Sequence, residues 1–238
     1  MRRAALVALA LAAGALAPAC ATTPQEIVAY DAVASPRLAP SFAGGNGWTV
    51  EVSRAELAIG PVYFCASEAG SANVCKTAQA EYAAVARVDA LAGPRPIGTV
   101  RGVTGAIRSA SYDLGVSWFD TQTTATPAPQ SPRGHSLSVT GVATKGATRY
   151  PFELSVDVVP QYQGQRAVPS SDASADVEDA RVRLEITCDV QTWLAQIDWD
   201  EAQKAGPVLD ASTQAHASVL VGMKNLRPPE FRWVPLSN

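Results

Sequence analysis

The sequence predicts a mainly β protein, an antiparallel β-sandwich with one or two short helices, and a partly open β-barrel is the alternative architecture. Apolar and polar residues alternate with a period of two in several segments, which places one row of side chains on the buried face of a strand. Glycine and proline separate these segments at short intervals, as is typical of antiparallel strands joined by turns. The cysteine and tryptophan spacing of immunoglobulin domains is absent, so the prediction concerns architecture alone.

The alternation begins at Trp48 and recurs along the chain. It predicts strands within residues 48–52, 55–59, 112–118, 137–139, 152–158 and 182–188. Lys145 and Gly146 interrupt the pattern between two of these segments, which predicts a β-hairpin with its turn at this dipeptide.

Two segments predict helices. Residues 77–91 are rich in alanine, place Tyr82, Val85 and Val88 three positions apart, and stop before a glycine and a proline. Residues 212–225 form the second candidate, because they precede two consecutive prolines.

The chain is expected to comprise three parts. Residues 1–19 form a signal peptide, residues 20–46 a flexible tether rich in proline and glycine, and residues 47–238 a single domain. Within that domain, residues 121–133 and 162–179 are predicted to be long exposed loops, because proline dominates the first segment and Ser, Gln and acidic residues dominate the second.

The first twenty residues have the order of a bacterial export signal. Arg2 and Arg3 precede an apolar stretch, and small residues then lead to Cys20. The stretch is too short for a permanent membrane-spanning helix, which needs about 20 apolar residues. The chain is therefore expected to be exported.

The residues Leu16-Ala17-Pro18-Ala19-Cys20 resemble a bacterial lipobox, although Ala17 replaces the preferred larger aliphatic residue and Pro18 is unusual there. The resemblance implies that Cys20 is acylated and anchors the protein to a membrane of the cell envelope. The Ala21 that follows resembles the pattern associated with outer-membrane sorting. Ordinary signal-peptidase cleavage is the alternative, and it would leave a soluble periplasmic or secreted protein.

The charge balance excludes one class of partner. Removal of residues 1–19 leaves 219 residues with 17 basic and 22 acidic side chains, a net charge of about −5. Nucleic-acid binding requires clustered lysine and arginine to replace counterions, and the sequence contains no basic run. No nucleic-acid partner is expected.

The remaining cysteines predict one disulfide. Cys65 and Cys75 flank a turn-rich segment, and an oxidising compartment favours a bridge between them over a metal pair, which would need further nearby ligands. Cys188 is expected to be a small buried apolar residue, unless Cys20 stays unmodified and reaches it.

One string invites a catalytic interpretation. Residues Gly134-His135-Ser136-Leu137-Ser138 resemble the G-x-S-x-G nucleophile elbow of α/β-hydrolases, except that Ser138 replaces the last glycine. A proline-rich loop precedes the string and a strand follows it, whereas the elbow requires a strand-to-helix turn. The interpretation that we favour is the start of a strand, and no catalytic residue is assigned.

The sequence predicts neither a metal site nor a cofactor. His135 and His216 are the two histidines, and His216 is expected to pack on a helix with Met223 and its apolar neighbours. A copper or haem site that uses a histidine with Met223 or Cys188 has no support in the spacing. The acidic clusters within 172–179 and 198–201 lack the calcium-loop pattern, so they are expected to be solvated.

The tryptophans are expected to be structural rather than sugar-binding. Trp48 and Trp118 occupy the apolar phase of their strands, and Trp199 is expected to turn inward between two aspartates. Trp233 is either an exposed aromatic residue or part of a closing edge strand.

These observations favour an exported cell-envelope lipoprotein that acts as a non-enzymatic binding or structural module. Its ligand is unknown, and an envelope protein is a possible partner besides the membrane itself. Two alternatives remain open. One is an exported hydrolase with an unfamiliar site, in which Ser136 would lie within hydrogen-bond reach of His216. The other is an accessory protein of copper or haem uptake.

Overall fold

The computed structural model describes residues 25–70 and 77–236. Its strands are β1 (Ile27–Pro36), β2 (Ser41–Ala43), β3 (Thr49–Ile59), β4 (Val62–Cys65), β5 (Ala80–Tyr82), β6 (Ala86–Asp89), β7 (Arg95–Val103), β8 (Gly105–Tyr112), β9 (Val116–Ser117), β10 (Thr126–Pro127), β11 (Leu137–Lys145), β12 (Thr148–Val156), β13 (Val168–Val177), β14 (Val182–Cys188), β15 (Val208–Leu209) and β16 (Glu230–Pro235). Its helices are α1 (Val190–Ala195), α2 (Trp199–Ala205) and α3 (Gln214–Val221), with single turns η1 (Gly45–Gly47), η2 (Pro132–Gly134) and η3 (Gly222–Leu226).

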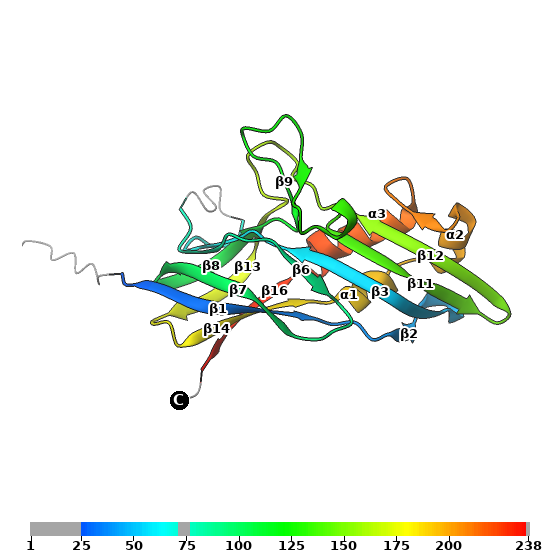
Figure 1. The fold of residues 1–238 in the computed structure, drawn as a ribbon, viewed down its shortest axis with the longest axis horizontal. Helices are drawn as coiled ribbons and strands as arrows, with labels where there is room; N and C mark the ends of the chain where they lie inside the picture. The colour runs from blue at the N-terminus through cyan, green and yellow to red at the C-terminus, as the bar shows by residue number, and fades with distance from the viewer. Residues whose placement is uncertain (1–24, 71–76, 237–238) are drawn as a thin grey trace, which may run out of the picture.

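The larger sheet has eight strands in the order β13-β8-β4-β5-β7-β1-β14-β16. Neighbouring strands run antiparallel except for β1 and β14, which are parallel. The two end strands, β13 and β16, contact each other without pairing, so the sheet curls into a nearly closed barrel (Figure 1). The predicted mainly β class is confirmed. The several sheets fit the predicted sandwich, and the nearly closed larger sheet fits the partly open barrel of the alternative.

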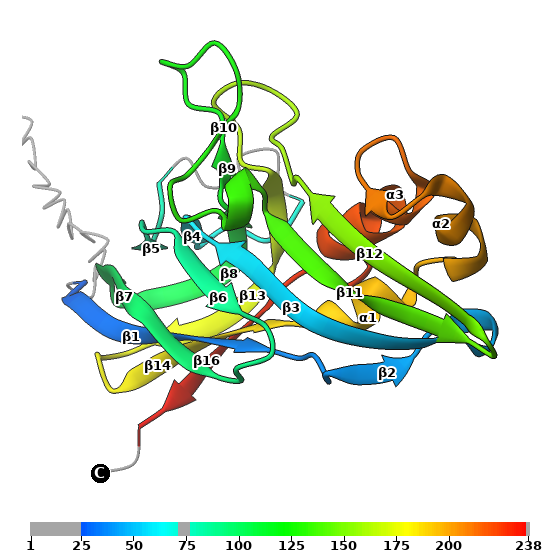
Figure 2. The same cartoon turned by 45° about the vertical axis from the view of Figure 1, so that its right-hand side comes forward.

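The second sheet has the order β15-β12-β11-β3-β2, and β6 also pairs with β3. Its hairpin of β11 and β12 runs from the pair Leu137 and Val156 to the pair Lys145 and Thr148, which confirms the turn predicted at Lys145-Gly146. Helices α2 and α3 pack beside β12 (Figure 2), where the rings of Phe152 and Trp199 have centroids 4.8 Å apart.

One hydrophobic core joins the two sheets and the helices. Trp48 and Trp199 are buried in it, as the sequence predicts, and Trp233 lies on the edge strand β16. Cys188 is a free thiol that is completely buried, which confirms its predicted role as a small apolar residue. Burial raises the pKa of Cys188 to about 12, so the thiol stays protonated and unreactive. Trp118 differs from its prediction, because it lies half-buried outside the core.

The predicted tether at residues 20–46 is wrong over most of its length. Residues 27–36 form β1, which lies inside the larger sheet between β7 and β14, and residues 41–43 form β2. The buried face of β1 carries Val28, Tyr30, Ala32 and Ala34, and alanine gives little contrast between the two faces of a strand. The folded domain therefore begins near residue 27 rather than residue 47.

Two further predictions need correction. Residues 77–91 form the short strands β5 and β6 instead of a helix, because pairing with β4, β7 and β3 outweighs the helix propensity of alanine. Residues 168–177, expected to be loop, form the edge strand β13. The predicted helix at 212–225 is confirmed as α3 and η3, whereas α1 and α2 were not predicted.

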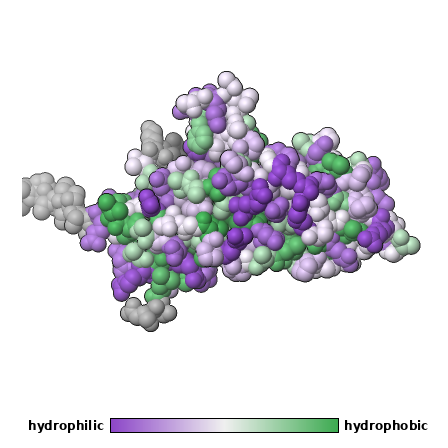
Figure 3. Space-filling view, viewed as in Figure 1, coloured by the Kyte–Doolittle hydropathy of each residue, from purple (hydrophilic) through white to green (hydrophobic). Residues whose placement is uncertain are grey.

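The predicted signal peptide, the lipidation residue Cys20 and Cys75 lie outside the described residues. The bridge between Cys65 and Cys75 therefore stays a prediction. Among residues 25–70 and 77–236, no helix combines the length and the apolar character needed to cross a membrane. The outer faces of the strands in the second sheet are hydrophilic (Figure 3), in agreement with the alternating burial of β3 and β12.

Candidate functional site

Two loops leave the body of the molecule side by side and form a projection, which we define as residues 118–133 and 157–167 (Figures 1 and 2). At its base β9 pairs antiparallel with β10, so that Ser117 faces Thr126 and Val116 faces Pro127. The predicted loop at 121–133 is confirmed as part of this unit, interrupted by β10 and η2. The projection is the candidate functional site of the protein.

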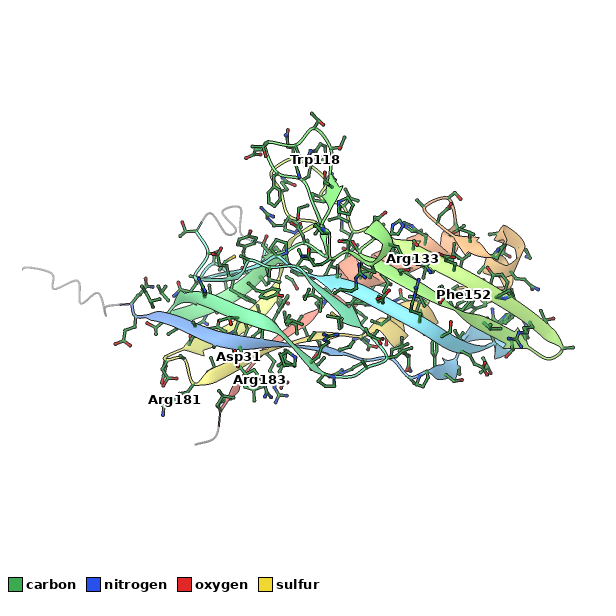
Figure 4. All side chains as sticks on the ribbon, in the orientation of Figure 1. Asp31, Trp118, Arg133, Phe152, Arg181 and Arg183 are labelled. Atoms are coloured by element: carbon green, nitrogen blue, oxygen red, sulfur yellow. The ribbon has the colours of Figure 1, made fainter. Side chains whose placement is uncertain are left out.

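Hydrogen bonds to backbone carbonyl oxygens tie the two loops together. The side-chain amide of Gln163 donates to the carbonyl oxygens of Asp120 and Gln122, at 2.9 and 2.7 Å. The amide of Gly164 donates to the carbonyl of Trp118 at 2.7 Å, and the Trp118 indole donates to the carbonyl of Gln122 at 3.1 Å. Trp118 thus lies inside the projection rather than in the sheet (Figure 4). Each loop satisfies polar groups of the other, so the two loops form one braced structure.

A buried carboxylate anchors the projection to the barrel. Asp113 directly follows β8 and is completely buried. Its Oδ2 accepts hydrogen bonds from Arg166 Nη1 and from the Ser117 hydroxyl, both at 2.8 Å, and its Oδ1 accepts from the Ala167 amide at 2.7 Å. A buried charge is tolerated only when it is paired and hydrogen-bonded, so these donors fix the end of the second loop to the end of β8.

The same arginine holds an aromatic ring of the first loop. The guanidinium carbon of Arg166 lies 5.4 Å from the ring centroid of Phe119 and 4.9 Å from that of Tyr63 on β4. These distances are within cation–π range. Arg166 therefore links the barrel, both loops and the Phe119 ring in one cluster.

The outer surface of the projection exposes large apolar side chains. Phe119 is 42% exposed, Tyr162 59% and Val159 39%. Most of the surrounding surface has intermediate hydropathy (Figure 3), to which its threonine and proline residues contribute. Exposed aromatic side chains on a braced loop are the usual anchors of binding surfaces.

Charged side chains of the projection are paired with neighbours. Arg133 near the base (Figure 4) forms an ion pair with Glu153, and Arg166 pairs with Asp113. His135 lies against Asp157, whose two carboxylate oxygens are each 3.1 Å from Nδ1. Among the described residues no ion pair is formed by Asp120, which is the remaining charged residue of the projection.

The fold brings the two histidines within electrostatic range of each other and of Asp157, although 81 positions separate them in the sequence. His216 lies in the first turn of α3 and is nearly buried. Burial lowers the pKa of His216, the charges of Asp157 and Asp210 oppose this shift, and His135 adds to it. We call His135, Asp157, Asp210 and His216 the histidine cluster.

Imidazole and carboxylate are ligands for divalent transition metals, and a histidine with a lowered pKa is neutral at pH 7. Within the part of the chain that the structure describes, however, no three His, Cys, Asp or Glu side chains are already arranged to hold an ion. Cys188 and Met223, considered above as metal partners for a histidine, are both fully buried in the core.

The nucleophile elbow considered at residues 134–138 is not formed. The Ser136 side chain is completely buried, and its oxygen accepts a hydrogen bond from the Val158 amide at 2.9 Å. No hydrogen bond between Ser136 and His216 occurs among the described residues. Strand β11 begins at Leu137, which confirms the favoured interpretation of this string as the start of a strand.

Sequence reasoning did not identify the exposed aromatic residues of the projection or the buried carboxylate of Asp113 that anchors the projection to the barrel. Phe119, Tyr162, Asp113 and Arg166 show no motif. The contacts of Arg166 with Asp113 and Phe119 join positions that are 53 and 47 apart in the sequence. The available signal was the presence of two long polar loops. That signal predicts exposure but not the bracing between the loops.

No protein-family model matches the chain, and no curated protein matches it. Among solved structures, the chain is similar to MbnP from Methylosinus trichosporium, with 14% sequence identity and a TM-score of 0.30. The similarity covers 72% of this chain and 78% of that chain. At this identity and TM-score, the similarity assigns neither a family nor a function.

Proposed function

We propose that the protein is a non-enzymatic binding module of the bacterial cell envelope, anchored through Cys20, that presents the projection to a partner. The observation that carries this proposal is the bracing of two loops around exposed Phe119 and Tyr162. A surface that is already ordered loses little conformational entropy on binding, so exposed aromatic anchors on it contribute to affinity at low cost.

The surroundings of Ser136 support the non-enzymatic part of the proposal. A nucleophile must reach its substrate and lie beside a base. The Ser136 hydroxyl is enclosed in the sheet and bonded to a backbone amide, and His216 lies instead within the histidine cluster.

Photo-crosslinking in the producing cells tests the proposal. We would place p-benzoylphenylalanine, which reacts with C–H bonds of any neighbouring molecule, at the exposed position Thr123 of the projection. The matched control carries the same residue at Val208, which is 57% exposed on β15. We expect a discrete adduct from position 123 and none from position 208. The same pattern from both positions, or no discrete adduct from position 123, would contradict the proposal.

A second candidate function is the handling of a transition metal. The histidine cluster supports it through the contact of His135 with Asp157 and the electrostatic influence of both on His216, although its side chains would have to move to hold an ion. Metal analysis of protein purified from the envelope without chelators tests this candidate, with the double variant His135→Ala/His216→Ala as the control. We expect bound copper, zinc or iron in the native protein and its loss in the variant. Native protein without these metals would exclude the candidate.

A further inference from the structure

We infer that the partner of the projection is a protein whose surface has an uncharged, apolar hollow that receives Phe119 and Tyr162. This inference rests on the proposed function and names the class of partner for the same surface. It follows from the shape of the projection, its charge and its rigidity.

The shape of the projection favours a macromolecular partner with a concave surface. Small molecules bind in concave sites that bury most of the ligand. The projection instead stands out from the barrel (Figures 1 and 2). The clefts among the described residues lie elsewhere: one is between β13 and residues 226–231, and others lie along the helices. A protruding loop that carries aromatic residues is complementary to a hollow in another protein.

The charge of the projection argues against an ionic partner. Its basic side chains, Arg133 and Arg166, are engaged by Glu153 and Asp113. A bilayer with anionic lipids attracts free lysine and arginine, and nucleic acid does the same. Asp120, the projection residue without an ion pair among the described residues, is acidic and does not attract anionic lipid or nucleic acid. The exposed aromatic rings are complementary to an apolar hollow, and an association through them depends little on salt.

The rigidity of the projection identifies the residues that carry the affinity. Arg166 holds the Phe119 ring from the barrel side, which leaves the rest of the ring exposed, and Tyr162 lies on the loop that Gln163 ties to the first loop. Central aromatic residues of an interface typically contribute most of its binding energy. Phe119→Ala and Tyr162→Ala are therefore each expected to weaken binding roughly 30-fold.

The adduct formed from p-benzoylphenylalanine at position 123 tests the class of partner. We expect mass spectrometry of the digested adduct to show peptides of one second protein, and we expect the adduct to be lost when Tyr162→Ala is added. A lipid or glycan adduct would overturn this inference and leave the proposed function standing. The absence of any discrete adduct would overturn both.

The purified protein found in that adduct then allows the affinity of the full mature chain to be measured by calorimetry. We expect Kd to change less than about threefold between 50 and 500 mM NaCl, and Tyr162→Ala to raise Kd roughly 30-fold. Leu226→Ala is the matched control, since Leu226 is 61% exposed but lies outside the projection. A Kd that rises a hundredfold with salt, or an unchanged Kd for Tyr162→Ala, would contradict the inference. Circular dichroism confirms that each variant is folded.

Discussion

At the scale of single residues, Asp113 is the side chain on which the projection depends most. Its carboxylate receives three hydrogen bonds, from a guanidinium, a hydroxyl and a backbone amide, and it has no access to solvent. Removal of such a carboxylate leaves the arginine and the amide without partners, which costs more than the loss of one exposed ion pair.

Asp113→Ala is therefore expected to lower the free energy of unfolding by about 3 kcal/mol, measured by chemical denaturation. The matched control is Asp179→Ala, because Asp179 forms an ion pair with Arg181 at an exposed position. We expect the control to leave stability nearly unchanged. Equal effects of the two substitutions would show that Asp113 is not a structural anchor.

The lowered pKa of His216 predicts how the stability of the protein changes with pH. Burial holds the pKa of His216 below its value in the unfolded chain, so the unfolded state binds the proton more tightly. The stability that neutral His216 contributes is present above the unfolded pKa, about 6.5, and is lost as the pH falls through the lower folded pKa. We expect His216→Gln to reduce the decrease in melting temperature between pH 7.5 and pH 5. An unchanged decrease in the variant would show that other groups are responsible.

At the scale of elements, alternation predicts strands well where the buried side chains are large. The hairpin of β11 and β12 buries Leu137, Val139, Phe152 and Leu154, and both its strands and its turn were predicted. Strand β1 escaped prediction because Ala32 and Ala34 occupy much of its buried face. Strands as short as β5 and β6 contain too few residues to show a period, and their pairing comes from distant segments.

The projection was predictable only in part, for a related reason. Composition identifies residues 121–133 as a loop, but the bracing depends on Gln163 and Arg166, which lie 30 or more positions further along the chain. Local pattern carries no information about such contacts. The same limit applies to the convergence of His135 and His216.

A substitution at Gly164 tests whether the bracing keeps the projection ordered. It has a φ of +77°, and a Cβ atom there would overlap the carboxylate of Asp120. We expect Gly164→Ala to loosen the two loops, so that trypsin cleaves faster after Arg133 and Arg166 while the barrel stays folded.

The matched control for this prediction is Gly146→Ala. Gly146 also has a positive φ, of +58°, but a Cβ atom there would meet no neighbour within 4 Å. Both substitutions carry the left-handed backbone cost of about 1 kcal/mol, so a difference between them isolates the overlap with Asp120. Equal cleavage rates for the two variants would contradict the prediction and show that the exposed Asp120 side chain moves aside without loosening the loops.

At the scale of the whole molecule, the early start of β1 limits how far the folded domain of an anchored protein can lie from the bilayer. Seven peptide units separate Cys20 from Ile27, and an extended chain of that length spans at most about 25 Å. The start of β1 and the tip of the β11–β12 hairpin lie at opposite ends of the long axis (Figure 1). If Cys20 is acylated, as we propose, the end with Ile27 stays near the bilayer and the hairpin tip extends away from it.

Lipid crosslinking tests this orientation together with the anchor. With p-benzoylphenylalanine at Ile27, which is 89% exposed, we expect a lipid adduct, and we expect none from Ala147 at the hairpin tip.

Cys20→Ala should abolish the adduct and move the protein to the soluble fraction, and mass spectrometry should find a diacylglyceryl group on Cys20 of the native chain. An unmodified N-terminus at Cys20, Ala21 or Thr22 would refute the anchor. Lipid adducts from both positions of an acylated protein would refute only the orientation, because the tether keeps the end with Ile27 near the bilayer whichever way the hairpin tip points.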